Sequence, residues 1–322
     1  MPSMDQFSVF AFAAGDPPPT AAELIQAARH ADALGFYSIS LPHHLTLPEA
    51  QVYTGFPQRN ILDPLVLLPA MAAVTQKIHV GTNSAIIPIL PPYVWARYFS
   101  TLDVLSGGRA LAGMAMGWFR KDFAAANANH KRRARHFDEA LGLIRRLWTE
   151  ESVTHQGETC SIEDMELEPK PVQRPHPPIW IGGHLPSVPR TAKHAQYLVP
   201  ANLTVEEVEQ VYMPRLREEN DRWGSSAGIC LSVRVHIGDE TGLDPEMLPL
   251  ISRLANPNQV SGIDVEEVAI IGDPGRCAER ITRYQKAGVS HFLLDFQYHG
   301  LASVDYSMRQ MDRFVEQVFP LL

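Results

Sequence analysis

Strands and helices alternate along this chain, and that alternation limits the folds open to it more than any other feature. Eight short stretches have strand character and are bounded by turn residues: 7–14, 36–42, 77–87, 109–116, 178–183, 197–200, 230–238 and 290–296. Helical patterns lie between most of them, such as 20–35, which ends at Gly35, and 133–148, which carries an apolar stripe. This order predicts an α/β fold, a single (β/α)8 TIM barrel that forms one domain over residues 1–322.

Two segments interrupt the alternation. Residues 149–178 are rich in turn residues and proline, and we expect an excursion there with a hairpin about Gln156 and Gly157. Residues 242–272 fit a strand–helix unit poorly and predict an extra helix and a mobile loop. The alternative fold is an open, doubly wound sheet with a second domain. The sequence favours it less, because neither GxGxxG nor GxxxxGK[ST] occurs.

The composition narrows the classes of partner. The net charge is -8, with 28 Lys+Arg against 36 Asp+Glu, so nucleic acid and anionic membrane surfaces are poor partners and a small-molecule substrate is expected. No apolar run reaches the length of a membrane span, and the N-terminal residues lack the pattern of a signal peptide. The three cysteines are far apart and predict neither disulfides nor a zinc site. We therefore expect a cytoplasmic protein.

Two adjacent histidines follow the second predicted strand, in the stretch ISLPHHLTLP. Alternate residues of a barrel strand face the lumen, where the small Ser38 and Ser40 fit, and the same parity puts His44 in the lumen and His43 outside it. A bulge after Pro42 would exchange the two histidines. The side chains of adjacent strand residues point apart, so no metal site is predicted. The bulky residues of the strand suit the contact with the helices: Tyr37, Ile39 and Leu41.

Other predicted strands also end in polar or small residues. In such barrels the active site lies at the C-terminal ends of the strands. The residues at these ends that we select are Asn83, Ser84, Met116, Gly117, Trp118, Gly182, Gly183 and His184. The pair Gly182–Gly183 precedes a predicted helix and exposes backbone N–H groups to an anion such as phosphate.

Six blocks that span most of the chain together resemble the luciferase-like monooxygenase family. They are GFYSISLPHHLTLP, LDPLVLLPAMAAVTQKIHVGTNSAIIP, STLDVLSGGRALAGMAMGWFRKDF, FDEALGLIRRLW, PKPVQRPHPPIWIGG and GDPGRCAERITRYQKAGVSHFLLDF. Members of this family are barrel flavoproteins that use FMN or the deazaflavin coenzyme F420. The chain resembles the F420-dependent branch most closely, through TGFPQ, LDVLSGGR and the proline-rich lead into IWIGG.

The resemblance implies roles for particular residues. His44 matches the catalytic histidine, and a bulge with a non-prolyl cis peptide is expected within Asn83 to Ile86. Tyr53, Phe56 and Trp118 are expected to line the substrate pocket, and a homodimer is the expected assembly. The expected cofactor-binding residues are His43, Asn83, Ser84, Ala85, Met116, Gly117, Gly182, Gly183 and His184, with the phosphate on Gly182–Gly183.

The chain departs from the family pattern in two places. It reads Pro42-His43-His44 where the F420 branch has Ser-Asp-His and the FMN branch has Glu-His-His. Residues 195–198 are Ala-Gln-Tyr-Leu where the family has Gly-Asp-Gly-Trp. This difference predicts that the rim of the pocket around the cofactor phosphate is altered. A basic run at 130–136 either contacts an anionic cofactor tail or forms a solvated face.

These observations predict an oxidoreductase. The first expectation is hydride transfer between coenzyme F420 and a small organic substrate, because a deazaflavin is restricted to hydride chemistry. The alternative is an FMN-dependent monooxygenase that uses reduced flavin and oxygen. A third possibility, of another class, is a degenerate barrel that binds a ligand without catalysis.

Overall fold

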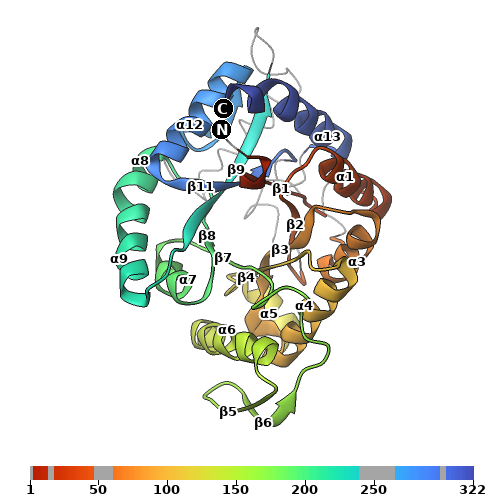
Figure 1. The fold of residues 1–322 in the computed structure, drawn as a ribbon, viewed down its shortest axis with the longest axis vertical. Coiled ribbons are helices and arrows are strands. Elements are labelled where there is room, and N and C mark those ends of the chain that lie inside the picture. The colour runs from red at the N-terminus through yellow and green to blue at the C-terminus, as the bar shows by residue number, and fades with distance from the viewer. Residues whose placement is uncertain (1–2, 14–17, 47–60, 239–264, 298–301) are drawn as a thin grey trace.

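Eight parallel strands close into a barrel in the computed structural model, which describes residues 3–13, 18–46, 61–238, 265–297 and 302–322 (Figure 1). The strands pair in sequence order, and the pairing of the last strand with the first completes the ring. They are β1 (Phe7–Phe10), β2 (Ser38–Pro42), β3 (His79–Ile86), β4 (Ala110–Ala115), β7 (Ile179–Gly182), β8 (Tyr197–Val199), β9 (Gly228–Ile237) and β11 (Val289–Asp295). The predicted TIM barrel is confirmed.

The helices form a ring outside the strands (Figure 1). The principal helices are α1 (Ala21–Ala33), α3 (Pro64–Val74), α4 (Pro92–Ser106), α6 (Arg133–Thr149), α7 (Val188–His194), α9 (Met213–Trp223), α12 (Pro274–Ala287) and α13 (Val304–Arg313). Shorter helical segments are α5 (Arg120–Ala125), α8 (Val205–Glu207), α11 (Val265–Val268), the 3-10 turns η1 (Met4–Gln6), η2 (Ile87–Ile89), η3 (His130–Arg132), η4 (Leu185–Ser187) and η7 (Phe319–Leu321), and the π-helical turns η5 (Val208–Tyr212) and η6 (Phe314–Val318). None of the described helices is long and apolar enough to cross a membrane.

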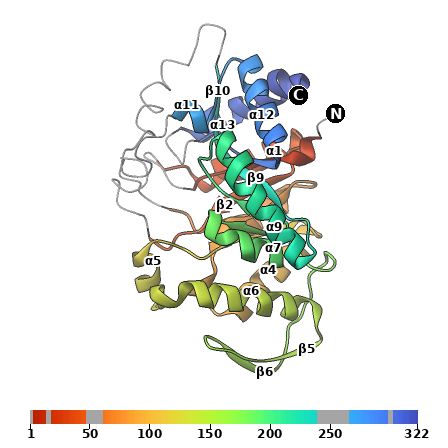
Figure 2. The same cartoon turned by 90° about the vertical axis from the view of Figure 1, so that its left-hand side faces the viewer.

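The two irregular segments have different outcomes. The predicted hairpin is present as β5 (Ser152–Gln156) and β6 (Ser161–Glu166), which project away from the barrel (Figure 2). The extra helix predicted within 242–272 is present as α11, whereas the strand β10 (Ile270–Gly272) at the end of the segment was not predicted. β10 pairs with the outer end of β9, and this pairing satisfies its backbone groups. The rest of that segment lies outside the described residues.

The barrel separates an outer core from a lumen. Ile39 and Leu41 are fully buried in the outer core against the helices, as strand parity predicts. Ser38 and Ser40 are fully buried on the other face, and the Ser38 hydroxyl donates to Ser8 Oγ over 2.7 Å. A separate apolar cluster fills the lumen and consists of Phe10, Phe12, Leu111, Trp180, Val199, Cys230 and Leu293.

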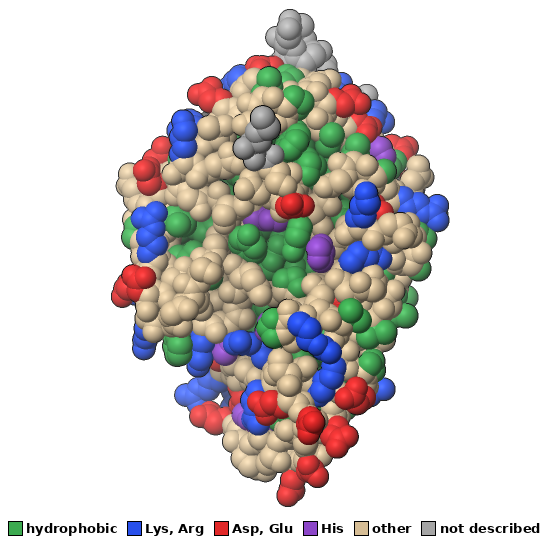
Figure 3. All heavy atoms as spheres, viewed as in Figure 1, with side chains coloured by type: hydrophobic (Ala, Val, Ile, Leu, Met, Phe, Trp, Pro, Cys, Tyr) green, Lys and Arg blue, Asp and Glu red, His purple; other side chains and the backbone are tan. Residues whose placement is uncertain are grey.

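The prediction for Tyr37 is wrong. β2 begins at Ser38, so Tyr37 precedes the strand. The alternation of side chains along the strand therefore does not determine where the Tyr37 side chain points. Its ring instead stacks on His79 and on Trp180, with ring centres 4.5 and 6.0 Å away, at the N-terminal end of the lumen. A space-filling view of the face seen in Figure 1 shows hydrophobic and histidine side chains gathered in a central hollow, with most charged side chains toward its edge (Figure 3).

Candidate active site

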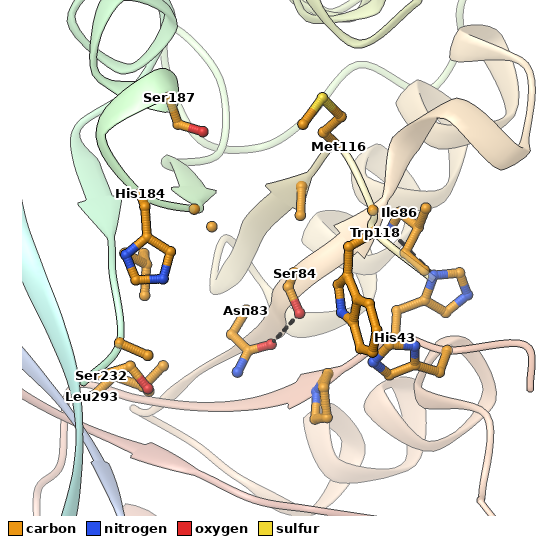
Figure 4. Close-up of a pocket in the computed structure, with 18 of the residues that line it drawn as sticks. His43, Asn83, Ser84, Ile86, Met116, Trp118, His184, Ser187, Ser232 and Leu293 are labelled. Atoms are coloured by element: carbon orange, nitrogen blue, oxygen red, sulfur yellow. Dashed lines mark hydrogen bonds between the residues drawn. The ribbon is translucent and has the colours of Figure 1, made fainter. Parts of the chain in front are cut away.

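A pocket of about 480 Å³ lies at the C-terminal ends of the barrel strands (Figure 4). Pockets of this size hold small molecules and cofactors. Ten of the thirteen residues predicted for the site line it: His43, His44, Asn83, Ser84, Met116, Gly117, Trp118, Gly182, Gly183 and His184. Apolar side chains complete the wall, including Phe10, Ile86 and Leu293. Two predicted substrate residues, Tyr53 and Phe56, lie outside the described residues.

A bulge in β3 carries two of the polar residues into the pocket. The register with β4 shifts between Thr82 and Ala85, and Asn83 and Ser84 occupy the extra length. The Ser84 hydroxyl donates to Asn83 Oδ1 over 2.8 Å, which fixes the amide and leaves its N–H groups as the donors (Figure 4). Opposite the bulge, a Cβ on Gly113 would lie 1.9 Å from the Thr82 carbonyl oxygen, so only glycine fits there.

The same bulge corrects two expectations. Ala85 does not line the pocket; it is fully buried in the outer core, because the extra residue turns its side chain away from the lumen. No cis peptide occurs within Asn83 to Ile86, since both cis bonds among the described residues precede prolines, at 168–169 and 174–175. The bulge alone accommodates the added length.

His44 is paired with a buried carboxylate that the sequence did not single out. Its Nδ1 lies 2.8 Å from Asp122 Oδ2, and the Asp122 side chain is fully buried. The second oxygen, Oδ1, accepts hydrogen bonds from the backbone of Leu45 and Thr46 and from the Thr46 hydroxyl. Burial raises the pKa of Asp122, but the hydrogen bonds from His44 and Thr46 outweigh it and lower the pKa, so this carboxyl is ionised at neutral pH.

His43 has a different environment from its neighbour. The backbone N–H of Ile86 donates to His43 Nδ1 over 3.3 Å, and the ring packs edge-on against Trp95 of α4. Burial lowers the pKa of His43 to about 4, so the ring is uncharged at neutral pH. His43 therefore supports the outer side of the β3 bulge, whereas His44 lies beside the carboxylate of Asp122.

The loop after β4 forms the rim around Trp118. Gly117 has φ +75°, and a Cβ there would lie 2.5 Å from Ile86 Cγ2, so the turn requires glycine. Two side chains of the basic run 130–136 hold this loop in place. Arg133 Nε donates to the Gly117 carbonyl over 3.1 Å, and His130 Nε2 lies 3.1 Å from the Trp118 carbonyl. Trp118 is 45% exposed and faces the pocket mouth.

The loop after β7 lines the other side of the pocket. A Cβ on Gly183 would lie 2.4 Å from Ser187 Oγ, so this loop presents backbone to the pocket. His184 Nδ1 lies 2.9 Å from the Tyr212 hydroxyl, which comes from the π-helical turn η5. Burial lowers the pKa of His184, which keeps the ring neutral at pH 7. Ser187 and Tyr212 were not found from the sequence, because no local motif marks them.

The unusual segment 195–198 does not reach this rim. It leads into β8 from the N-terminal side, and Gln196 Oε1 accepts the backbone N–H of Ile179 over 2.6 Å. Tyr197 packs edge-on against Trp180 at the base of the lumen. The expected alteration of the phosphate rim is therefore wrong, since none of the residues 195–198 lines the pocket. Among the described residues there is no cluster of side chains suited to a metal ion.

A family model for luciferase-like monooxygenases matches residues 4–243. The chain belongs to this family. The members of the family are oxidoreductases and monooxygenases, so the luciferase-like chain is an enzyme of that kind, and the barrel and pocket are those of its fold.

Individual relatives of this luciferase-like protein differ in their cofactor. The FMNH(2)-dependent dimethylsulfone monooxygenase of Pseudomonas putida is 24% identical over 309 residues, 84% of each chain. An F420-dependent secondary alcohol dehydrogenase, solved with an F420-acetone adduct, superposes with a TM-score of 0.79 at 18% identity over 98% of both chains. A monooxygenase from Streptomyces bottropensis gives a TM-score of 0.80 at 21% identity, over 98% of this chain and 99% of that one.

The pocket of this luciferase-like protein fits a flavin or deazaflavin. Its volume of about 480 Å³ and its apolar walls suit a tricyclic ring. The Asn83 amide supplies N–H donors on one side, and the backbone at Gly182 and Gly183 with the Ser187 hydroxyl forms a cradle on the other. The Asn83 amide and the Ser187 hydroxyl are neutral donors, which suit ring heteroatoms and a phosphate, whereas the Gly183 N–H donates to the Val199 carbonyl over 3.2 Å.

Proposed function

We propose that this protein is a coenzyme F420-dependent oxidoreductase that transfers hydride between the coenzyme and a small organic substrate. The observation that carries the choice of coenzyme is a group of exposed cations beside Trp118: Arg120 and Lys121 of α5, and Lys131 and Arg132 of η3. The chain as a whole has a net charge of -8, so this local excess of cations stands out. It suits the anionic polyglutamate tail of coenzyme F420, which would extend out of the pocket.

The chemistry divides between coenzyme and protein. A bound deazaflavin supplies or accepts a hydride. Asn83 and the Gly182–Gly183 loop would hold it, and Trp118 would cover part of the mouth. His44 would exchange the proton that accompanies the hydride, with Asp122 stabilising the charged form of its ring.

The second candidate is an FMN-dependent monooxygenase. It is favoured by the dimethylsulfone monooxygenase, whose similarity extends over 84% of this chain. FMN ends in a phosphate and has no polyglutamate tail, so the cations beside Trp118 would have no role in binding it. The two candidates therefore differ in their dependence on those cations.

The test compares coenzyme F420, FMN and FAD by fluorescence titration of the purified protein. We expect saturable binding of coenzyme F420 to wild type, weakened by salt because surface charges are screened, and weakened about tenfold at low salt in Lys131→Glu/Arg132→Glu. The control Lys77→Glu/Lys286→Glu makes the same change of charge at exposed positions away from the pocket and should bind as wild type. Saturable binding of FMN alone would overturn the proposal, and binding of none would favour the degenerate barrel.

We also propose that two copies associate through α3 and α4. The outer faces of these helices expose Val66 at 75%, Leu105 at 62%, Val94 at 45% and Val104 at 42%. Exposed apolar side chains on neighbouring helices can form a protein interaction surface. Sedimentation of Val66→Asp/Leu105→Asp should give a lower mass than wild type, and a monomeric wild type would contradict this assembly.

A further inference from the structure

We propose that Asp122 is a positioning residue that fixes the tautomer of His44, so that His44 Nε2 is the atom that accepts a proton from the bound molecule. This proposal rests on the proposed oxidoreductase function for its role in turnover. The tautomer itself can be tested without turnover.

The hydrogen bonds around Asp122 determine the proton positions. Every group that contacts its carboxylate is a donor: His44 Nδ1 at 2.8 Å, Leu45 N at 3.0 Å, and the N and Oγ1 of Thr46 at 2.8 and 2.9 Å. An ionised carboxylate can only accept, so the bond with His44 requires a proton on Nδ1. A neutral His44 ring then carries no proton on Nε2, and that atom is a base.

His43 has the opposite arrangement. A backbone N–H can only donate, so the contact from Ile86 N requires a bare Nδ1 on His43. The neutral His43 ring therefore carries its proton on Nε2. Two adjacent histidines at the end of one strand are thus held in opposite tautomers by Asp122 and by Ile86, and only His44 is prepared to take up a proton.

This arrangement selects the chemical class of the substrate. A base at His44 Nε2 acts on a molecule that brings a hydroxyl group, such as a secondary or primary alcohol. In that step the O–H bond breaks and a new bond forms between the proton and Nε2, while the carbon that bears the oxygen gives up a hydride, which a bound deazaflavin would accept. The O–H electron pair becomes the second carbon–oxygen bond of the carbonyl product. The resulting imidazolium lies beside the buried Asp122 carboxylate, which stabilises it. In the reverse direction the same atom returns the proton to a carbonyl oxygen.

Two variants separate the tautomer from the structural role of Asp122. In Asp122→Asn, the amide oxygen can still accept from Leu45 and Thr46, while the amide N–H₂ faces His44 Nδ1 and requires that atom to be bare. The loop contacts stay and the tautomer reverses. In Thr46→Val, one hydrogen bond to Oδ1 is lost and the contact with His44 is unchanged. This variant is the matched control for the loop.

The first measurement is proton-detected nitrogen-15 NMR of the histidine rings at a pH high enough that the His44 ring is neutral, with His44 assigned by comparison with His44→Gln. We expect a protonated Nδ1 and a bare Nε2 for His44 in wild type and in Thr46→Val, and the reverse in Asp122→Asn. A bare Nδ1 on His44 in wild type would overturn the proposal, whatever the protein catalyses.

The second measurement is alcohol oxidation with coenzyme F420. We expect Asp122→Asn to lower kcat by roughly 10²- to 10⁴-fold with KM little changed, and Thr46→Val to stay within about threefold of wild type. Equal losses of kcat in both variants would mean that Asp122 only holds the loop in place and does not act through the His44 tautomer. If no substrate is turned over while the NMR result holds, the proposed function fails and the tautomer assignment stands.

Discussion

The two ends of the barrel lumen are built from similar residue types and are used differently. At the base, Tyr37, Trp180, Tyr197 and His291 pack into one cluster, with the ring centres of Trp180 and His291 4.9 Å apart. At the mouth, histidine and tryptophan recur, but they surround a pocket of about 480 Å³. Aromatic rings close one end, and at the other end glycine turns and a strand bulge keep the pocket open.

The histidines differ in the same way. His291 at the base is 2% exposed and bonds to a neutral hydroxyl, with its Nε2 2.7 Å from Ser8 Oγ. His44 at the mouth has an ionised carboxylate at 2.8 Å. Protonating a buried imidazole ring costs more free energy when no opposite charge lies nearby than when a carboxylate lies beside it. Proton chemistry is therefore possible at the mouth and suppressed at the base.

The largest expected effect is at the mouth. His44→Ala removes the group that exchanges the proton and should lower kcat by roughly 10²- to 10⁴-fold while thermal unfolding changes little. His43→Ala should reduce turnover less, because His43 acts through the shape of the β3 bulge. Steady-state rates with coenzyme F420, alongside calorimetry, measure both. A His44→Ala variant as fast as wild type would rule out its catalytic role.

A variant at the base should have the opposite effect, lowering stability and leaving turnover almost unchanged. Trp180 is 1% exposed, and Trp180→Ala should reduce the free energy of unfolding by about 3–5 kcal/mol through lost contacts and a cavity. Chemical denaturation measures this, and kcat at a temperature where the variant is folded should stay near that of wild type.

The matched control is the tryptophan of the mouth. Trp118→Ala replaces a side chain that is 45% exposed, so the loss of stability should be under about 1 kcal/mol, with weaker cofactor binding. If Trp180→Ala abolished turnover in the folded state, the division between the two ends would be lost.

The barrel could be anticipated from the sequence because its strands depend on local periodicity. The eight predicted strands all exist, and parity placed Ser38 and Ser40 in the lumen and Ile39 and Leu41 outside it. Parity failed at Tyr37, which precedes the strand. The expectation for Ala85 came from the family resemblance and failed for a different reason, because the added residue of the β3 bulge turns its side chain outward.

The central contact of the mouth could not be anticipated in this way. His44 and Asp122 are 78 residues apart and belong to the loops after different strands. Their contact depends on how two loops meet in space, and periodicity carries no information about that. The local signal for Asp122 is its place four residues after Trp118 in the rim loop, and it distinguishes this aspartate only once a partner is known.

The last expected effect concerns the stability of the base in acid. Burial lowers the pKa of His291 to about 3, against about 6.5 for an unfolded histidine. Between these values the unfolded chain binds the proton and the folded chain does not, so the stability is complete above pH 6.5 and falls as the pH is lowered toward 3. The expected slope is about 1.4 kcal/mol per pH unit from this residue. His291→Gln can keep a hydrogen bond to Ser8 without titrating, so urea unfolding between pH 6.5 and 4 should show a shallower decline than wild type. An unchanged slope would mean that His291 is protonated in the folded state, and that the base, like the mouth, tolerates charge.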